Sequence, residues 1–141
     1  MRFMIIVKAT KDSEAGMMPD ESDLATMGKF HEELAKAGVL LDASGLKPTS
    51  SAWRIKYDGN QRSFVDGPFA ETKELVAGYT IIKTKTREEA IAWTKRFPNP
   101  SHRNGIGEIE VRQLFELEDF GESPAIDRFK QIDLPSQRPN A

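Results

Sequence analysis

The segment LVAGYTIIKT, residues 75–84, decides the fold of this chain, because its residues 75–83 predict a strand with apolar side chains on both faces. A strand of this kind has to be covered on both sides, unlike the half-exposed strands of many antiparallel sheets. The segment RFMIIVKA, residues 2–9, has the same character, with Phe3, Ile5 and Val7 on one face and Met4 and Ile6 on the other. We therefore expect a sheet whose two faces are both covered.

Two helices are predicted beside these strands. Asp20 is placed to cap a helix over about residues 21–37, and Gly38 is a natural end for it. The apolar stripe of this helix recurs at spacings of three and four, through Leu24, Met27, His31 and Leu34. A second helix is predicted to begin at a T-x-x-E capping box, residues 86–89, and to be closed by Pro98.

The remaining strands are short. VLLDASGL, residues 39–46, predicts one strand, and residues 108–117 predict the last one. Residues 52–57 and 61–66 predict the two strands of a hairpin, joined by the tight turn DGN, residues 58–60. The order is then strand, helix, strand, hairpin, strand, helix, strand.

This order predicts a ferredoxin-like α+β fold, an antiparallel sheet with two helices on one face. Two helices cover only one face, so a homodimer with sheets packed face to face, a dimeric α+β barrel, is the simplest expectation. A C-terminal segment that folds back over the sheet is the competing explanation. We expect residues 1–117 to form one domain and residues 118–141 to form a C-terminal extension. That extension would begin with a short helix at Ser123-Pro124 and end in a loose tail from about Pro135.

Composition excludes several classes of function. The 141 residues contain no cysteine, which excludes disulfides, thiolate metal sites and cysteine nucleophiles. Acidic residues number 22 and basic residues 20, a net charge of −2 that argues against a general affinity for nucleic acid. No apolar run approaches the roughly 20 residues of a membrane helix, and the first residues lack the pattern of a signal peptide. We expect a cytoplasmic protein without direct nucleic-acid or membrane partners.

The segment DGPFAETKE, residues 66–74, is the first candidate site. Gly67 and Pro68 satisfy the chemistry of a turn, and Phe69 is a predicted anchor. A turn does not require the four charged residues of this segment, which are Asp66, Glu71, Lys73 and Glu74. A carboxylate beside an ammonium group suits proton transfer, because the lysine keeps the carboxylate ionised as a base. The same groups could instead bind a polar ligand or form a structural salt bridge.

Other candidates lie on the helices and strands. His31, on the apolar stripe of the first helix, is either a core histidine or the best general base near neutral pH. Arg54 and Arg112 are candidates to hold an anionic substrate, or else strand surface. Tyr79 is a further candidate for substrate binding, with core packing as the alternative. His102 is expected to be exposed, and the sequence contains no metal-ligand spacing or cofactor motif.

Four segments of the chain together resemble the DGPF group of the YCII-related (YciI-like) family, over roughly residues 1–117. In chain order they are FHEELAKAGVLLDASGL (30–46), DGPFAETKELVAGY (66–79), EEAIAWTKRFP (88–98) and GEIEVRQL (107–114). The resemblance implies a dimeric α+β barrel of ferredoxin-like subunits. It also implies similarity to proteins encoded beside extracytoplasmic-function sigma factors. YciI-like members are proposed to use a His–Asp pair, and one relative is a dehydrochlorinase of a hydroxylated aromatic.

The chain departs from that family pattern at two places. Counting back from Gly38 puts Met27 where the family has its histidine, and His31 lies one turn later on the same face. Arg112-Gln113 stands where the group commonly has Arg-Pro.

Two functional hypotheses follow. The first is a small cofactor-free lyase or isomerase that transfers a proton on a small polar or aromatic molecule. The second is a non-catalytic dimeric module that binds a ligand or serves sigma-factor-type transcription control.

Overall fold

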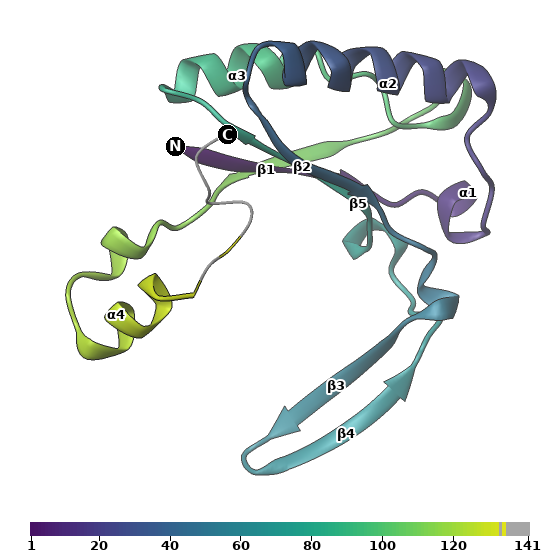
Figure 1. Cartoon of the computed structure of the whole chain (residues 1–141). Helices are drawn as coiled ribbons and strands as arrows, with labels where there is room; N and C mark the ends of the chain where they lie inside the picture. The colour runs from purple at the N-terminus through teal and green to yellow at the C-terminus, as the bar shows by residue number, and fades with distance from the viewer. Residues whose placement is uncertain (133, 135–141) are drawn as a thin grey trace.

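The computed structural model describes residues 1–132 and residue 134, and it has an α+β architecture with an antiparallel sheet (Figure 1). Four strands form this sheet in the order β2-β5-β1-β6, and every neighbouring pair is antiparallel. Their bounds are Arg2–Lys8 for β1, Leu40–Gly45 for β2, Val76–Lys83 for β5 and Ile109–Gln113 for β6. The two strands that the sequence makes apolar on both faces, β1 and β5, are the two central ones.

Helices α2 (Glu21–Lys36) and α3 (Arg87–Lys95) lie side by side over one face of the sheet (Figure 1). The predicted start of α2 is confirmed, because the Asp20 side chain accepts a hydrogen bond from the Asp23 amide. At α3 the Thr86 side chain accepts from the Glu89 amide as predicted. The Glu89 carboxylate, however, accepts from the amide of Lys85 and does not close a capping box. Each helix therefore begins where the sequence places it.

The core lies between these helices and the sheet. Its buried members come from β1, α2, β5, α3 and the approach to β2, and are Phe3, Ile5, Phe30, Leu34, Val39, Ile82 and Ala90. Successive strand residues point to opposite faces, so Met4, Ile6 and Ile81 point to the other face of the sheet, where they are only half-buried. The second apolar face predicted from the sequence is therefore present, and α2 and α3 do not cover it.

Strands β3 (Trp53–Asp58) and β4 (Gln61–Asp66) form a separate two-stranded hairpin that projects away from the four-stranded sheet (Figure 1). Asp58 pairs with Gln61, which leaves Gly59 and Asn60 as a two-residue turn, as the sequence predicts. Gly59 has a φ of 58°, the left-handed conformation that such turns need. The hairpin is thus inserted in the chain between β2 and β5, two neighbouring strands of the sheet.

One helix and several single turns lie between these elements. Helix α1 (Lys11–Glu14) lies between β1 and α2, and Thr10 caps it. Short 3-10 turns form at η1 (Thr49–Ser51), η2 (Thr72–Glu74) and η3 (His102–Asn104). These turns set the direction of the loops that carry the candidate residues.

The last strand is shorter than predicted, because β6 ends at Gln113 and not at Leu117. The reason is that β1 is the only strand paired with β6 among the described residues: Gln113 pairs with Phe3, and the Leu114 amide donates to Arg2 O, at the start of β1. Beyond this point β1 offers no further residue to pair with, and Leu117 enters the 3-10 turn η4 (Leu117–Phe120).

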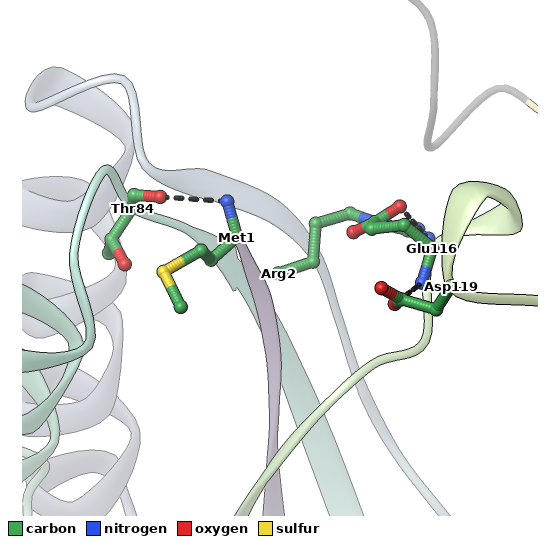
Figure 2. A network of polar contacts seen from close by, with 5 residues as sticks. All are labelled: Met1, Arg2, Thr84, Glu116 and Asp119. Atoms are coloured by element: carbon green, nitrogen blue, oxygen red, sulfur yellow. Dashed lines mark hydrogen bonds and ion pairs between the residues drawn. The ribbon is translucent and has the colours of Figure 1, made fainter.

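The C-terminal extension follows directly on a fixed anchor at Glu116. The Arg2 Nε atom lies 2.9 Å from Glu116 Oε1, and the Glu116 amide donates to Asp119 over 2.7 Å (Figure 2). The predicted short helix is confirmed as α4 (Pro124–Lys130), with Ser123 as its cap and proline in its first turn. The loose tail predicted from about Pro135 lies outside the described residues.

Candidate functional site

The loop of residues 66–74 is held at its start by hydrogen bonds to the segment before the hairpin. The Gly67 amide donates to Ala52 O over 2.8 Å. The Phe69 amide donates to the Thr49 hydroxyl over 3.1 Å, and that hydroxyl donates to Glu14 over 2.6 Å. Helix α1, turn η1 and the loop are therefore linked into one hydrogen-bonded unit.

Gly67 is required by this close approach. A Cβ atom at residue 67 would lie 1.7 Å from Thr49 O and 3.1 Å from Ala52 O, both of which are backbone atoms. No side chain fits there unless the two backbone segments separate. The prediction that Gly67 serves backbone geometry is confirmed.

The far end of the loop is equally fixed. Leu75 is buried, and its carbonyl accepts a hydrogen bond of 3.0 Å from the Ala9 amide. Between the two ends, Glu71 has a φ of 65°, a left-handed conformation that costs a non-glycine residue about 1 kcal/mol or more. It is followed by the 3-10 turn η2, so this part of the loop is not extended.

The four charged residues of the loop, Asp66, Glu71, Lys73 and Glu74, are exposed. Within the described part of the chain, none of their side chains forms a hydrogen bond or ion pair. The salt bridge that the sequence allows between Lys73 and a neighbouring carboxylate is therefore not formed within this chain. The backbone of the loop is therefore fixed at both ends, while its four charged side chains have no hydrogen-bond or ion-pair partner among the described residues.

The candidate binding residues occupy three different places. The Arg54 guanidinium lies 3.8 Å from the centre of the Phe69 ring and so connects the hairpin to the loop. The Tyr79 hydroxyl donates to Asp42 over 3.1 Å, on the sheet face away from the helices. Arg112 lies opposite Met4 on that same face, but in the edge strand β6. The structure thus brings Arg54 to the loop and leaves the other two on the sheet.

His31 bridges helix α2 and the sheet. Its Nδ1 atom lies 2.8 Å from Met27 O, and because a carbonyl only accepts, Nδ1 is the donor. In the neutral ring, Nε2 accepts from the hydroxyl of the buried Thr80, also over 2.8 Å. Both nitrogens have partners, and no hydrogen bond or ion pair among the described residues joins His31 to the charged loop. This geometry corresponds to the packing alternative for His31.

A second histidine forms an arrangement that the sequence did not reveal. The expectation that His102 is exposed is wrong. Its Nδ1 atom donates to Asp23 Oδ2 over 2.9 Å. The side chains of His102 and Asp23 are about three-quarters buried, with 24% and 29% exposed. This hydrogen bond is the main reason that the pKa of Asp23 lies below its ordinary value. The two residues are 79 positions apart, so no local pattern could have paired them.

The loop before β6 is built to present His102. Asn99 accepts from the Ser101 amide and donates to Gly105 O, and Gly107 packs so closely that a Cβ atom would lie 2.8 Å from Asn99 Oδ1. Asp20 lies beside the pair, with ligand atoms of all three residues within 4.8 Å of one another. The carboxylates of Asp20 and Asp23 already accept hydrogen bonds from backbone amides at the start of α2. The cluster is therefore the N-terminal cap of α2, and His102 is hydrogen-bonded to one of its carboxylates.

Two comparisons with known proteins bear on the family of this chain. The family model described as the YCII-related domain matches residues 1–118. An uncharacterised protein of Rhizobium meliloti (strain 1021) is 27% identical over 97 residues, which cover 69% of this chain and 78% of the relative. In the described residues, no helix is long and apolar enough to cross a membrane.

Proposed function

The chain belongs to the YCII-related domain family, and on this basis we propose that it is a homodimeric protein that binds a small polar or aromatic ligand at the loop of residues 66–74. The observation that carries the proposal is the contrast within this loop. Its backbone is fixed at both ends, while four charged side chains have no partner within the described residues. Binding groups on a fixed frame lose little conformational entropy when a ligand arrives.

The dimer is proposed from the uncovered face of the sheet. Met4, Ile6 and Ile81 form an apolar strip there, and α2 and α3 both lie on the opposite side. Packing against the same face of a second copy would bury this strip and form a dimeric α+β barrel of two ferredoxin-like subunits. The competing sequence-based explanation, cover by the C-terminal segment, makes a monomer sufficient. Light scattering at micromolar concentration separates the two.

The ligand class follows from the groups on offer. Lys73 suits a carboxylate or phenolate oxygen, and Asp66, Glu71 and Glu74 suit hydroxyl donors. Phe69, whose ring is in contact with Arg54, is the aromatic residue of the loop and suits an aromatic ligand. Hydroxylated aromatics, lactones and small hydroxy acids are therefore the ligands to screen.

The test is a thermal-shift screen of these compounds, followed by matched variants. A stabilising ligand should lose its effect with Lys73→Ala or Asp66→Asn. It should keep its effect with Lys29→Ala, which removes an exposed lysine from α2. A ligand that binds the Lys73→Ala protein unchanged would place binding elsewhere and refute the proposed site.

A second candidate function, proton transfer, is favoured by the His102–Asp23 pair. A carboxylate that holds Nδ1 fixes the ring and leaves Nε2 as a base, and no described residue is a partner of Nε2. The experiment is to incubate each ligand of the screen in D₂O and to follow deuterium incorporation by NMR. Incorporation that His102→Gln abolishes while binding persists would support catalysis. Equal incorporation in both proteins would exclude His102 as the base.

A further inference from the structure

Two projecting segments carry apolar surface that the described residues of this chain leave exposed. The first, the hairpin arm, consists of β3 and β4, residues 53–66. Its paired residues share a face, so one side of the hairpin is apolar and largely exposed: Trp53 (62%), Ile55 (41%), Tyr57 (65%) and Phe64 (60%). A two-stranded hairpin is at best marginally stable by itself in water. Its apolar side therefore needs a partner.

The second segment, the C-terminal arm, covers residues 114–132. It also exposes large apolar side chains, namely Phe115 (73%), Phe120 (59%), Phe129 (55%) and Ile132 (52%). Helix α4 has 7 residues and packs mainly against η4, whereas isolated helices shorter than about 12–15 residues are marginal in water. The base of the arm is nevertheless fixed, because Arg2 binds both carboxylate oxygens of Glu116 (Figure 2). A fixed base and an apolar surface are the properties of a docking element.

The two arms are complementary in charge. Basic residues exceed acidic ones by one in the hairpin arm, with Arg62 and Asp66 on its apolar side and Arg54, Lys56 and Asp58 on the other side. The C-terminal arm has the opposite excess, with Glu116, Glu118, Asp119, Glu122 and Asp127 against Arg128 and Lys130. Arms of opposite charge attract each other and repel their own kind, which selects one pairing.

The topology keeps the two arms apart within one chain. The hairpin arm follows the edge strand β2, and the C-terminal arm follows the opposite edge strand β6. Both leave the sheet on the side away from α2 and α3 (Figure 1). When two such sheets face each other across a two-fold axis that runs along the strands, the β2 edge of one copy lies over the β6 edge of the other. Each hairpin arm then meets the C-terminal arm of the second copy.

We propose that the hairpin arm of one copy docks on the C-terminal arm of a second copy, so that two identical arm contacts clasp the dimer. This inference rests on the proposed homodimer and adds the surface that holds it together. The occupant of the exposed apolar side of β3 and β4 is the acidic, phenylalanine-rich segment of residues 114–132. The apolar strip at Met4, Ile6 and Ile81 lies between the two clasps.

Cysteine cross-linking tests this pairing directly, because the full chain contains no cysteine. Ser63→Cys places one thiol on the side of the hairpin arm opposite its apolar side, so that the docking residues stay intact. Ala125→Cys places one on α4, at an exposed residue. The two variants are mixed, one of them isotopically labelled, and treated with a flexible bis-maleimide long enough to reach around the edge of the hairpin. We expect mass spectrometry to find a link between the two introduced thiols that joins labelled to unlabelled chains. The matched control Ala25→Cys, on exposed α2, should give no link with Ser63→Cys.

A second measurement keeps the inference testable if the thiols are badly placed. Ile132→Ser should raise the dimer dissociation constant on the order of tenfold or more, since a two-fold interface loses the side chain twice. Ile106→Ser makes the same change at a residue that is 97% exposed and outside both arms, and should leave the constant unchanged. A dimer with neither the link nor the Ile132→Ser effect overturns the arm contact but not the dimer. A protein that light scattering finds monomeric overturns both.

Discussion

Replacing Gly67 by alanine should detach the loop of residues 66–74 while the rest of the fold persists. The added Cβ would lie 1.7 Å from Thr49 O, whereas a relaxed contact between carbon and oxygen is about 3.3 Å or more. The loop and the Thr49 segment would have to separate by roughly 1.6 Å to relieve this overlap. The two oxygen atoms nearest to the added Cβ, Thr49 O and Ala52 O, both belong to the backbone, so no side chain can rotate out of the way.

The cost follows from the hydrogen bonds that such a separation breaks. These are the bonds from the Gly67 amide to Ala52 O and from the Phe69 amide to Thr49 Oγ1, at 2.8 and 3.1 Å. At about 0.5–1.5 kcal/mol each, their loss lowers the free energy of unfolding by roughly 1–3 kcal/mol. The Phe69 amide should also lose its protection from hydrogen exchange.

Urea unfolding followed by circular dichroism measures the first effect, and amide exchange by NMR measures the second. Gly28→Ala is the matched control, because Gly28 lies on the exposed side of α2 with no atom near its missing Cβ. There the same substitution should stabilise the protein by about 0.5–1 kcal/mol. A Gly67→Ala protein with unchanged stability and an unchanged exchange rate at Phe69 would refute the reasoning.

Three further predictions concern the core and the two histidines. Leu34→Ala should lower the free energy of unfolding by about 2–5 kcal/mol in urea titrations, because it leaves a cavity at a fully buried site. Thr80→Val removes the hydroxyl partner of His31 and should cost about 1–3 kcal/mol, with a shift of the imidazole signals in NMR spectra. Asp23→Asn removes the carboxylate that binds His102. Because folding lowers the pKa of Asp23, the stability it contributes is present above about pH 4 and disappears as pH falls through the folded-state pKa. Thermal unfolding should therefore separate the two proteins near neutral pH and bring them together in strong acid.

Local signals in the sequence were sufficient for most of the elements. Asp20 and Gly38 define the ends of α2 because capping depends on residues within one turn. Apolar residues at successive positions identified β1 and β5 as strands with two apolar faces, and the DGN turn located the hairpin. The last strand was predicted too long, because its length depends on where β1 begins, more than a hundred positions earlier in the chain. A pattern in residues 108–117 cannot contain that information.

For the candidate site too, some features could be predicted from the sequence and others depended on the tertiary structure. From the sequence alone, Gly67 was identified as a structural residue and the charges beside it as surplus to the turn, since both follow from the geometry of a few neighbouring residues. Only the tertiary structure paired His102 with Asp23 and enclosed His31 between Met27 and Thr80. The contacts of His102 with Asp23 and of His31 with Thr80 join residues far apart along the chain, and a hydrogen bond depends on distances that packing sets. The sequence by itself thus determined the family of this protein and most of its helices and strands. The packing of these elements decided which side chains come into contact.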